Sequence, residues 1–297
     1  MKLSICIPVY NFDVRELVLD LKKEIEDNEI DAEIILIDDA SEENFKIINS
    51  NLQSEVQKFI FLENNIGRSK IRNLFLDYTK GDYLLFLDCD VKIDNTNFLL
   101  NYLNEIEKNF WVELIYGNFK IDTLYSKSLR NRYSVEREIF YEERSSDFSL
   151  FKTVNFIIKR KIFESFLFDE RLRNYGYEDF VFAKLLESNQ IKYFAFNNPV
   201  IHFDDTSNSA FLKKVDIGID SLCKLSKDEK SKNFIKDIKV YDTAVKLRKI
   251  GVDSLVLFLY NFLNKIIKNN LLSENPSIKY LDIYKLNLLL KKMKAIS

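Results

Sequence analysis

The sequence predicts an α/β fold with a doubly wound, mostly parallel central sheet and a C-terminal helical extension. Strand-length apolar runs alternate with amphipathic helical segments over the first 90 residues, and beyond about residue 210 only helical patterns remain. The 297 residues are 46% hydrophobic and 14% aromatic, which excludes a disordered chain. A chain of this length can bury one large core and a smaller second one.

The first half of the chain alternates strand and helix. Continuous apolar runs predict buried strands, and apolar residues three or four positions apart predict helices. Because each strand is followed by a helix that can cross back over the sheet, neighbouring strands should pair in parallel. The predicted strands are residues 3–9, 32–37, 58–62 and 83–87, and the predicted helices are residues 14–28, residues 43–55 and one that begins near residue 68.

The second half is less regular. Residues 125–147 mix arginines, acids and aromatics, which predicts either a mobile helix and loop over a site or a solvated helix with salt-bridged faces. Helices are predicted at residues 95–109, from about residue 178, and at 210–226, 235–250 and 254–272, and strands at residues 112–121 and 153–158. We expect residues 1–209 to form the main domain, with a division after residue 121, and residues 210–297 a helical region.

Charge and cysteine content suggest where the protein works. Residues 211–297 contain 18 Lys and Arg against 9 Asp and Glu, a net of +9, which leaves residues 1–210 at −11. The three scattered cysteines fit a reducing compartment, and the start lacks a signal-peptide cleavage site, so we expect a cytoplasmic protein. A place at the cytoplasmic face of the membrane is compatible with this expectation. The C-terminal helices either pack on the body or a second subunit, or lie on an anionic membrane, since their apolar run is too short to span one.

Acidic pairs follow two of the predicted strands. Asp38-Asp39 follows the second strand, and Asp88-Cys89-Asp90 follows the fourth. Ligands bind at the carboxyl ends of the strands in such sheets, and two close carboxylates favour a cation between them. The alternative is that these aspartates close a turn or cap the next helix. Gly67 opens a basic helix start that suits a phosphate, although an exposed basic face is the commoner explanation.

Four motifs follow one another in the first 90 residues: Ile7-Pro8-Val9-Tyr10-Asn11, Ile37-Asp38-Asp39-Ala40-Ser41, Asn65-Ile66-Gly67 with Arg72-Asn73, and Phe86-Leu87-Asp88-Cys89-Asp90. Taken in this order they resemble family 2 glycosyltransferases, which have the GT-A fold; one departure is Ala40, where relatives often have glycine. The resemblance implies that residues 1–209 are the glycosyltransferase domain, with a nucleotide-sugar half (1–121) and an acceptor half (122–209). The resemblance implies a metal ion on Asp90 and a nucleotide held by Pro8, Tyr10, Asn11, Asp39, Arg68, Arg72 and Asp88.

A second motif, Gly176-Tyr177-Glu178-Asp179, opens a predicted helix. Acids in a first helical turn are routine because they complement the helix dipole. The motif also resembles the catalytic element of inverting members of the family, which implies Asp179 as general base and Glu178 as the residue that holds the acceptor sugar. His202, the only histidine, stands where related enzymes complete the metal shell, and carboxylate with imidazole favours Mn²⁺, or Mg²⁺.

The function expected from this resemblance is metal-dependent, inverting transfer of a sugar, most simply from a UDP-sugar, to a hydroxyl of a glycan or lipid-linked glycan. A sugar nucleotidyltransferase is disfavoured because the loop after the first strand lacks glycine. A non-catalytic nucleotide-binding assembly subunit is the other alternative. No nucleic-acid partner is expected. The sequence does not decide whether the chain forms a homo-oligomer. The sugar transferred is expected to depend on a pocket around Tyr116, Asn118, Asn155 and Tyr177, with Tyr116, Gly117 and Asn118 on the acceptor side.

Overall fold

The computed structural model describes residues 1–145, 148–172, 176–229, 231 and 233–296. These residues form two compact units, which are described separately. The first unit comprises Met1–Asp122, Glu138–Arg173 and Glu178–Phe203, and the second comprises Thr123–Arg137, Asn174–Tyr177 and Asp204–Ser297. Residues 123–137 therefore group with the C-terminal helices, which no motif in the sequence indicated.

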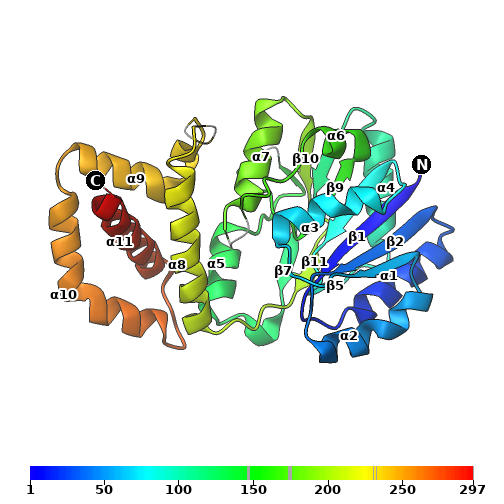
Figure 1. The fold of residues 1–297 in the computed structure, drawn as a ribbon, viewed down its shortest axis with the longest axis horizontal. Coiled ribbons are helices and arrows are strands. Elements are labelled where there is room, and N and C mark those ends of the chain that lie inside the picture. Colours follow the sequence, from blue (N-terminus) through cyan, green and yellow to red (C-terminus); the bar gives the residue numbers. More distant parts are fainter. Residues whose placement is uncertain (146–147, 173–175, 230, 232, 297) are drawn as a thin grey trace. The chain divides into compact units, whose positions relative to one another are not determined.

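An eight-stranded mixed sheet forms the centre of the first unit (Figure 1). β1, β2, β3 and β4 pair in parallel, as predicted, while β9 runs antiparallel to both β4 and β6. The strand order 3-2-1-4 places β1 between two strands whose ends carry acids. In spatial order the strands are β3 (Lys58–Phe61), β2 (Ala32–Asp38), β1 (Leu3–Val9), β4 (Tyr83–Leu87), β9 (Asn155–Lys159), β6 (Leu114–Tyr116), β10 (Tyr193–Phe196) and β8 (Arg144–Ser145).

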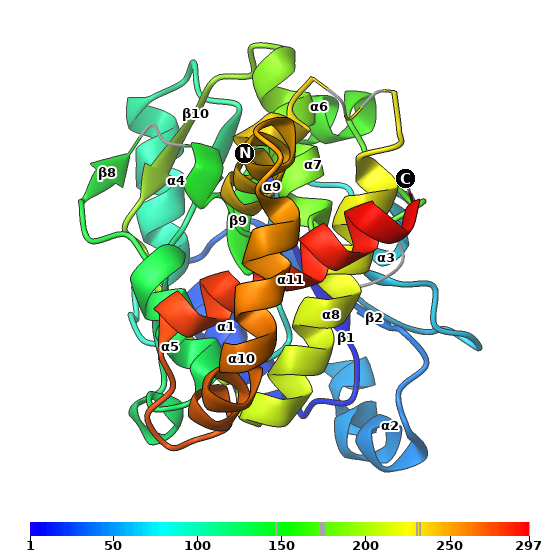
Figure 2. The ribbon, with the colours of Figure 1, turned by 90° about the vertical axis from the view of Figure 1, so that its left-hand side faces the viewer.

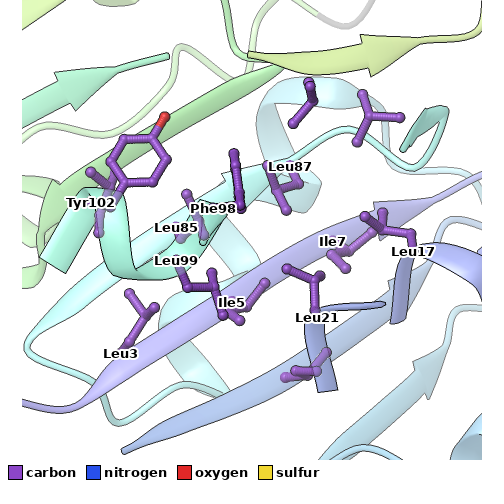
Figure 3. Close-up of a cluster of buried hydrophobic side chains, with 14 of the residues drawn as sticks. Leu3, Ile5, Ile7, Leu17, Leu21, Leu85, Leu87, Phe98, Leu99 and Tyr102 are labelled. Carbon is purple, nitrogen blue, oxygen red and sulfur yellow. The ribbon is translucent and has the colours of Figure 1, made fainter. Parts of the chain in front are cut away.

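Helices cover both faces of this sheet, as a doubly wound fold requires. Alternate residues of β1 point to opposite faces, so Ile5 and Ile7 join a core beneath α1 and α4 while Cys6 joins the core beneath α3 and α7. Figure 3 shows the first of these cores. The helices are α1 (Arg15–Asp27), α2 (Glu43–Asn49), α3 (Arg68–Leu74), α4 (Phe98–Lys108), α6 (Arg160–Ser165) and α7 (Glu178–Ser188).

A second sheet of three short strands lies in the same unit. It consists of β5 (Val91–Ile93), β11 (Val200–His202) and β7 (Phe119–Ile121), with β11 in the middle. The single strand predicted over residues 112–121 is wrong. The chain makes β6 and then β7 in different sheets, because Gly117 and Asn118 leave the first ladder to bond Asn155 and Val200.

The second unit is helical. Its helices are α5 (Leu129–Arg137), α8 (Asn208–Leu225), α9 (Lys239–Lys249), α10 (Asp253–Leu271) and α11 (Ile278–Ile296), of which α11 was not predicted. Phe211, Tyr260, Ile267 and Leu281 lie in its core. Within the described ranges no single helix is long and apolar enough to cross a bilayer; only α9 and α10 taken together, with a bend of 117° between them, pass that test.

Short 3₁₀ helices extend or link the longer elements. The predicted helix over residues 43–55 is α-helical only as far as Asn49 and then tightens into 3₁₀ geometry, since the last turn of a helix often does so. The 3₁₀ helices are η1 (Ser50–Ser54), η2 (Phe75–Asp77), η3 (Thr123–Tyr125), η4 (Phe148–Leu150) and η5 (Ile235–Asp237).

Candidate active site

The candidate site begins at the carboxyl ends of β2, β1 and β4, which are neighbours in the sheet. All three strands run in parallel, so the segments that follow Val9, Asp38 and Leu87 emerge at the same edge. The loops start close together, since the backbone N–H of Asp39 donates to the carbonyl of Val9 at 2.8 Å. The order and direction of the strands are therefore enough to bring three of the four predicted motifs to the same edge of the sheet.

Asp39 holds the loop that leads into α3. Its two carboxylate oxygens accept from the backbone N–H groups of Ile66 at 2.7 Å and Gly67 at 3.2 Å. Burial raises the pKa of Asp39, against the opposing effect of these two donors. Each carboxylate oxygen retains a second lone pair. Asp39 can therefore anchor this loop and still accept a hydrogen bond from a ligand.

The loop after β1 is fixed by Asn11. Its backbone lies in the left-handed region at φ 49°, which asparagine tolerates, and its N–H donates to the Ser41 hydroxyl at 2.8 Å. The Asn11 side-chain oxygen accepts from the backbone of Glu42 at 2.8 Å. Asn11 thus ties two loops of the predicted nucleotide site together, while Tyr10 beside it is exposed and Pro8 is half-buried.

Arg72 and Asp88 form an ion pair below these loops. Nη2 of Arg72 lies 2.7 Å from Oδ1 of Asp88, and Nη1 donates to the carbonyl of Arg68 at 3.2 Å. Arg72 is buried, whereas Arg68 and Lys70 are exposed, so this helix start is more than a basic surface. Nε of Arg72 has no hydrogen-bond partner among the residues that the structure describes.

Asp90 and His202 meet although 112 positions separate them in the sequence. β5 follows Asp90 directly and pairs antiparallel with β11, which places His202 opposite Val91 and its Nε2 3.4 Å from Oδ2 of Asp90. Burial acts to raise the pKa of Asp90, but His202 and Arg68 outweigh it and the pKa is lowered. Asp90 is therefore ionised at neutral pH.

This pair fits a divalent cation. Two atoms bound at about 2.1 Å and at right angles to one ion lie roughly 3.0 Å apart, close to the observed 3.4 Å. A carboxylate with an imidazole suits Mn²⁺ and tolerates Mg²⁺. The described residues contain no group of three or more histidine, cysteine or acidic side chains that could hold a metal. The protein would thus supply two ligands, and the remaining positions would fall to other oxygens.

Glu178 and Asp179 open α7. Glu178 is buried and lies 3.5 Å from Nη1 of Arg68, and Asp179 accepts from the Thr153 hydroxyl at 3.1 Å. Burial and then the Glu178 charge raise the pKa of Asp179 to about 6, against the opposing charges of Arg72 and Lys152. The charge of Asp88 adds to this increase, so the two aspartates belong to one electrostatic cluster.

The backbone before α7 is unusual. Tyr177 has φ 72° and Gly176 has φ 105°, and a left-handed conformation is rare for a tyrosine. Strain of this kind costs about 1–3 kcal/mol and tends to occur at functional sites. The predicted motif therefore includes a strained turn directly before its two acids.

Three of the four residues expected around the sugar pocket are buried. Tyr116 is fully buried among Phe140, Phe148 and Phe151, and Asn155 is 1% exposed. Asn155 accepts from the Tyr102 hydroxyl at 2.7 Å and donates to two backbone carbonyls. These contacts hold neighbouring segments of the first unit together. Asn118 is also buried.

Thr153 is a site residue that sequence analysis missed. It lies two positions before β9 and belongs to no recognisable motif. Its position beside Asp179 arises because β9 and the start of α7 lie against the same core, where Phe156 packs near Phe182. Only the fold reveals this contact.

Comparison with known proteins agrees with this geometry. The model of the family "Glycosyl transferase family 2" matches residues 4–172. An uncharacterized glycosyltransferase of Haemophilus influenzae is 34% identical over 121 residues, which cover 39% of this chain and 46% of that protein. A poly(ribitol-phosphate) beta-glucosyltransferase of Bacillus spizizenii is 32% identical over 114 residues, which cover 37% of this chain and 18% of that protein. The matched region therefore spans less than half of either relative.

Solved structures show the same fold at lower identity. TarS of S. aureus superposes with a TM-score of 0.56 at 18% identity, covering 99% of this chain and 53% of that one. The mannosyltransferase PcManGT of Pyrobaculum calidifontis, solved with GDP-Man and Mn²⁺, gives a TM-score of 0.59 at 13% identity, covering 99% and 86%. These structures have the GT-A architecture expected from the motifs. Because the family model matches more than half of the sequence, the chain belongs to glycosyl transferase family 2.

Proposed function

We propose that the protein is a metal-dependent, inverting glycosyltransferase that transfers a sugar from a UDP-sugar to a hydroxyl of a glycan or lipid-linked glycan. The observation that carries the proposal is one cluster in the first unit. It combines two side chains that can bind one cation, Asp90 and His202, with a carboxylate whose pKa is raised, Asp179. Departure of a nucleotide and activation of a hydroxyl need these two kinds of group.

Asp90 and His202 are the proposed metal ligands. When bound, the divalent ion would neutralise charge on the departing diphosphate as a Lewis acid. Asp90 is ionised at neutral pH because its pKa is lowered, and an ionised carboxylate is the form that binds a cation. Mn²⁺ is proposed first and Mg²⁺ second. PcManGT, a structural neighbour solved with Mn²⁺, supports this order.

The nucleotide is proposed to lie over Pro8, Tyr10, Asn11 and Asp39, with Arg68, Arg72 and Asp88 nearer its ribose and phosphates. Asp39 can accept from an imide N–H, since its carboxylate keeps free lone pairs after bonding two backbone donors. The fragment TarS 1–349, solved with UDP, superposes with a TM-score of 0.55 at 18% identity and supports a uridine donor.

Asp179 is the proposed general base, and Glu178 the residue that holds the acceptor. A base with a pKa of about 6 is ionised at neutral pH yet basic enough to take a proton as a bond forms. Direct displacement on the face opposite the nucleotide would turn an α-linked donor into a β-linked product. The name of the B. spizizenii relative, a poly(ribitol-phosphate) beta-glucosyltransferase, supports this outcome and a polymeric acceptor. The assignment of donor binding to residues 1–121 and acceptor binding to residues 122–209 stays a prediction.

The experiment is a calorimetric panel of UDP-, GDP- and dTDP-sugars with and without Mn²⁺, followed by assays of donor hydrolysis. The proteins compared are the wild type, Asp90→Ala, Asp179→Asn and Asp94→Ala. Asp94 is a matched control, since this exposed aspartate pairs with Lys120 and has no assigned role. We expect a UDP-sugar to bind only with metal and Asp90→Ala to weaken that binding by at least about tenfold.

Asp179→Asn should keep donor binding and lower turnover by roughly 10²–10⁴-fold, because only the base is lost. Asp94→Ala should match the wild type in both assays. Failure of every nucleotide sugar to bind in the presence of metal would overturn the proposal. Metal-independent binding that Asp90→Ala leaves unchanged would overturn the metal assignment alone.

A further inference from the structure

Helix α10 of the second unit has an exposed apolar stripe along one side. Six large side chains recur at positions i, i+3, i+4, i+7, i+8 and i+11, and each is between 48% and 68% exposed. Tyr260, Ile267 and Leu271 on the opposite side are buried in the helical core. In Figure 2, which faces the C-terminal helices, α10 passes in front of α11. The stripe consists of Leu255, Phe258, Leu259, Phe262, Leu263 and Ile266.

Basic side chains border this stripe. Lys265 and Lys268 of α10 are exposed. Lys291 and Lys294 of α11 lie alongside, since Lys291 sits 5.6 Å from the Tyr260 ring and Lys294 donates to the Ser254 hydroxyl at 3.1 Å. The sequence from 254 to 273 contains no acid, and residues 239–296 hold eleven Lys and Arg against four Asp and Glu, a net of +7.

We propose that the α10 stripe with these four lysines is a docking surface for an anionic lipid bilayer. An amphipathic helix lies in the plane of a membrane when its apolar side enters the acyl boundary and its basic residues meet anionic headgroups. Lysine suits the border because its aliphatic stem can lie along the apolar region while its ammonium reaches the phosphates. The surface lies on the membrane and does not cross it.

A second copy of the chain fits this surface less well. A symmetric dimer brings the same patch of both subunits together, so the lysines of one stripe would meet those of the other. Residues 254–273 offer no carboxylate to compensate that charge. An anionic bilayer supplies the complementary charge throughout, which is why the lipid is the favoured occupant.

The test is vesicle flotation of the full chain at low and high salt. The vesicles are pure phosphatidylcholine, or phosphatidylcholine with one third phosphatidylglycerol. We expect binding to the anionic vesicles only, and weaker binding at high salt because the attraction is screened. Phe258→Ser with Phe262→Ser should weaken binding at least tenfold. Lys265→Gln with Lys268→Gln should also weaken binding and should make it less dependent on salt.

A matched control is Leu19→Ser with Ile47→Ser, since these apolar side chains are equally exposed but lie on α1 and α2. This variant should float like the wild type. Circular dichroism and donor binding of each variant check that the fold is retained. The proposal is overturned if anionic vesicles do not bind, or if the control weakens binding as much as the phenylalanine variant. It is also overturned if sedimentation without lipid shows a dimer that only the phenylalanine variant dissociates, which would assign the stripe to a second copy.

Discussion

The hydroxyl of Thr153 lies 3.1 Å from Oδ1 of Asp179, and the two residues are 26 positions apart in the sequence. Thr153 is buried, so its hydroxyl is held near this carboxylate and does not turn to solvent. A hydroxyl that donates to a carboxylate favours the charged form and fixes its orientation. We therefore expect Thr153 to act as a positioning residue that fixes the orientation of the proposed base, Asp179.

Replacing Thr153 by valine removes this donor while keeping the shape of the side chain. We expect turnover to fall roughly tenfold, the value of one hydrogen bond to a charged group. The acidic limb of the pH profile should move to higher pH because the ionised carboxylate loses a donor. Thr153→Ser keeps a hydroxyl and should restore both properties. If Thr153→Val lowers activity without moving the limb, the threonine has only a structural role.

If Asp179 is the base, its pKa, which burial and Glu178 raise to about 6, should set the acidic limb of the pH dependence of the reaction. A base works only when deprotonated, so kcat/KM should rise about tenfold per pH unit below 6 and level off above it. Initial rates across a pH series measure this limb. Enzyme that retains full activity well below pH 6 would contradict the assignment of Asp179 as base.

Glu178→Gln removes the charge at this position and keeps a side chain of the same size that can form hydrogen bonds. The glutamate raises the pKa of its neighbour by charge repulsion, so the neutral glutamine should move the limb to lower pH. If Glu178 also holds the acceptor, KM for the acceptor should rise in the same variant. A limb that stays in place in Glu178→Gln would show that the charge of Glu178 does not help to set the pKa of Asp179.

The parts of the site that follow strand ends could be predicted from the sequence. In a parallel sheet every strand points its carboxyl end to one edge, so Asp39 and Asp88 had to lie near one another once strands 32–37 and 83–87 were recognised. The helix start at Gly67 was also predictable, because glycine readily adopts the positive φ of a tight turn, and Gly67 has φ 86° directly before α3. Local patterns sufficed for these elements.

The contacts between distant segments could not be predicted from local patterns, and the meeting of His202 with Asp90 was expected only from the family resemblance. His202 reaches Asp90 because β5 and β11 pair in a second, three-stranded sheet, and strands of three residues leave too short a pattern to recognise. The hydroxyl of Thr153 meets Asp179 only through packing. Tyr116 illustrates the opposite error, since it was expected to line a pocket while its ring fills the core.

Ala40 has φ 61°, a left-handed conformation in which a β-carbon is crowded. Such a conformation costs an alanine roughly 1–2 kcal/mol, partly offset in a glycine variant by the greater entropy of the unfolded chain. We therefore expect Ala40→Gly to raise the free energy of unfolding by up to about 1 kcal/mol. Ala40→Val should lower it by more than about 1 kcal/mol, because a branched side chain fits this region worse. Urea unfolding measures both, and a valine variant as stable as the wild type would contradict the strained turn.

Glu24 caps a helix that is distant in the sequence. Its Oε1 accepts from the backbone N–H groups of Leu99 at 2.7 Å and Leu100 at 3.1 Å, in the first turn of α4. These are groups that a helix start leaves without intrahelical partners. Oε2 is buried with no hydrogen-bond partner in the described part of the chain. Burial raises the pKa of Glu24 to about 7, against the opposing effect of the backbone donors.

This raised pKa makes stability depend on pH with a definite sign. The folded state binds the Glu24 proton more tightly than the unfolded state, where the pKa is near 4.5, so this group's contribution falls as pH rises from 4.5 to about 7 and is constant above. Glu24→Gln keeps an acceptor at Oε1 and cannot ionise. It should match the wild type near pH 5 and exceed its free energy of unfolding near pH 8. Glu24→Ala should lose about 1–2 kcal/mol near pH 5, since the α4 donors are left unpaired, and this deficit should shrink toward pH 8 because alanine cannot ionise either. Urea denaturation at the two pH values tests this, and a glutamine variant whose advantage does not grow with pH would show that Glu24 is ionised in the folded protein throughout.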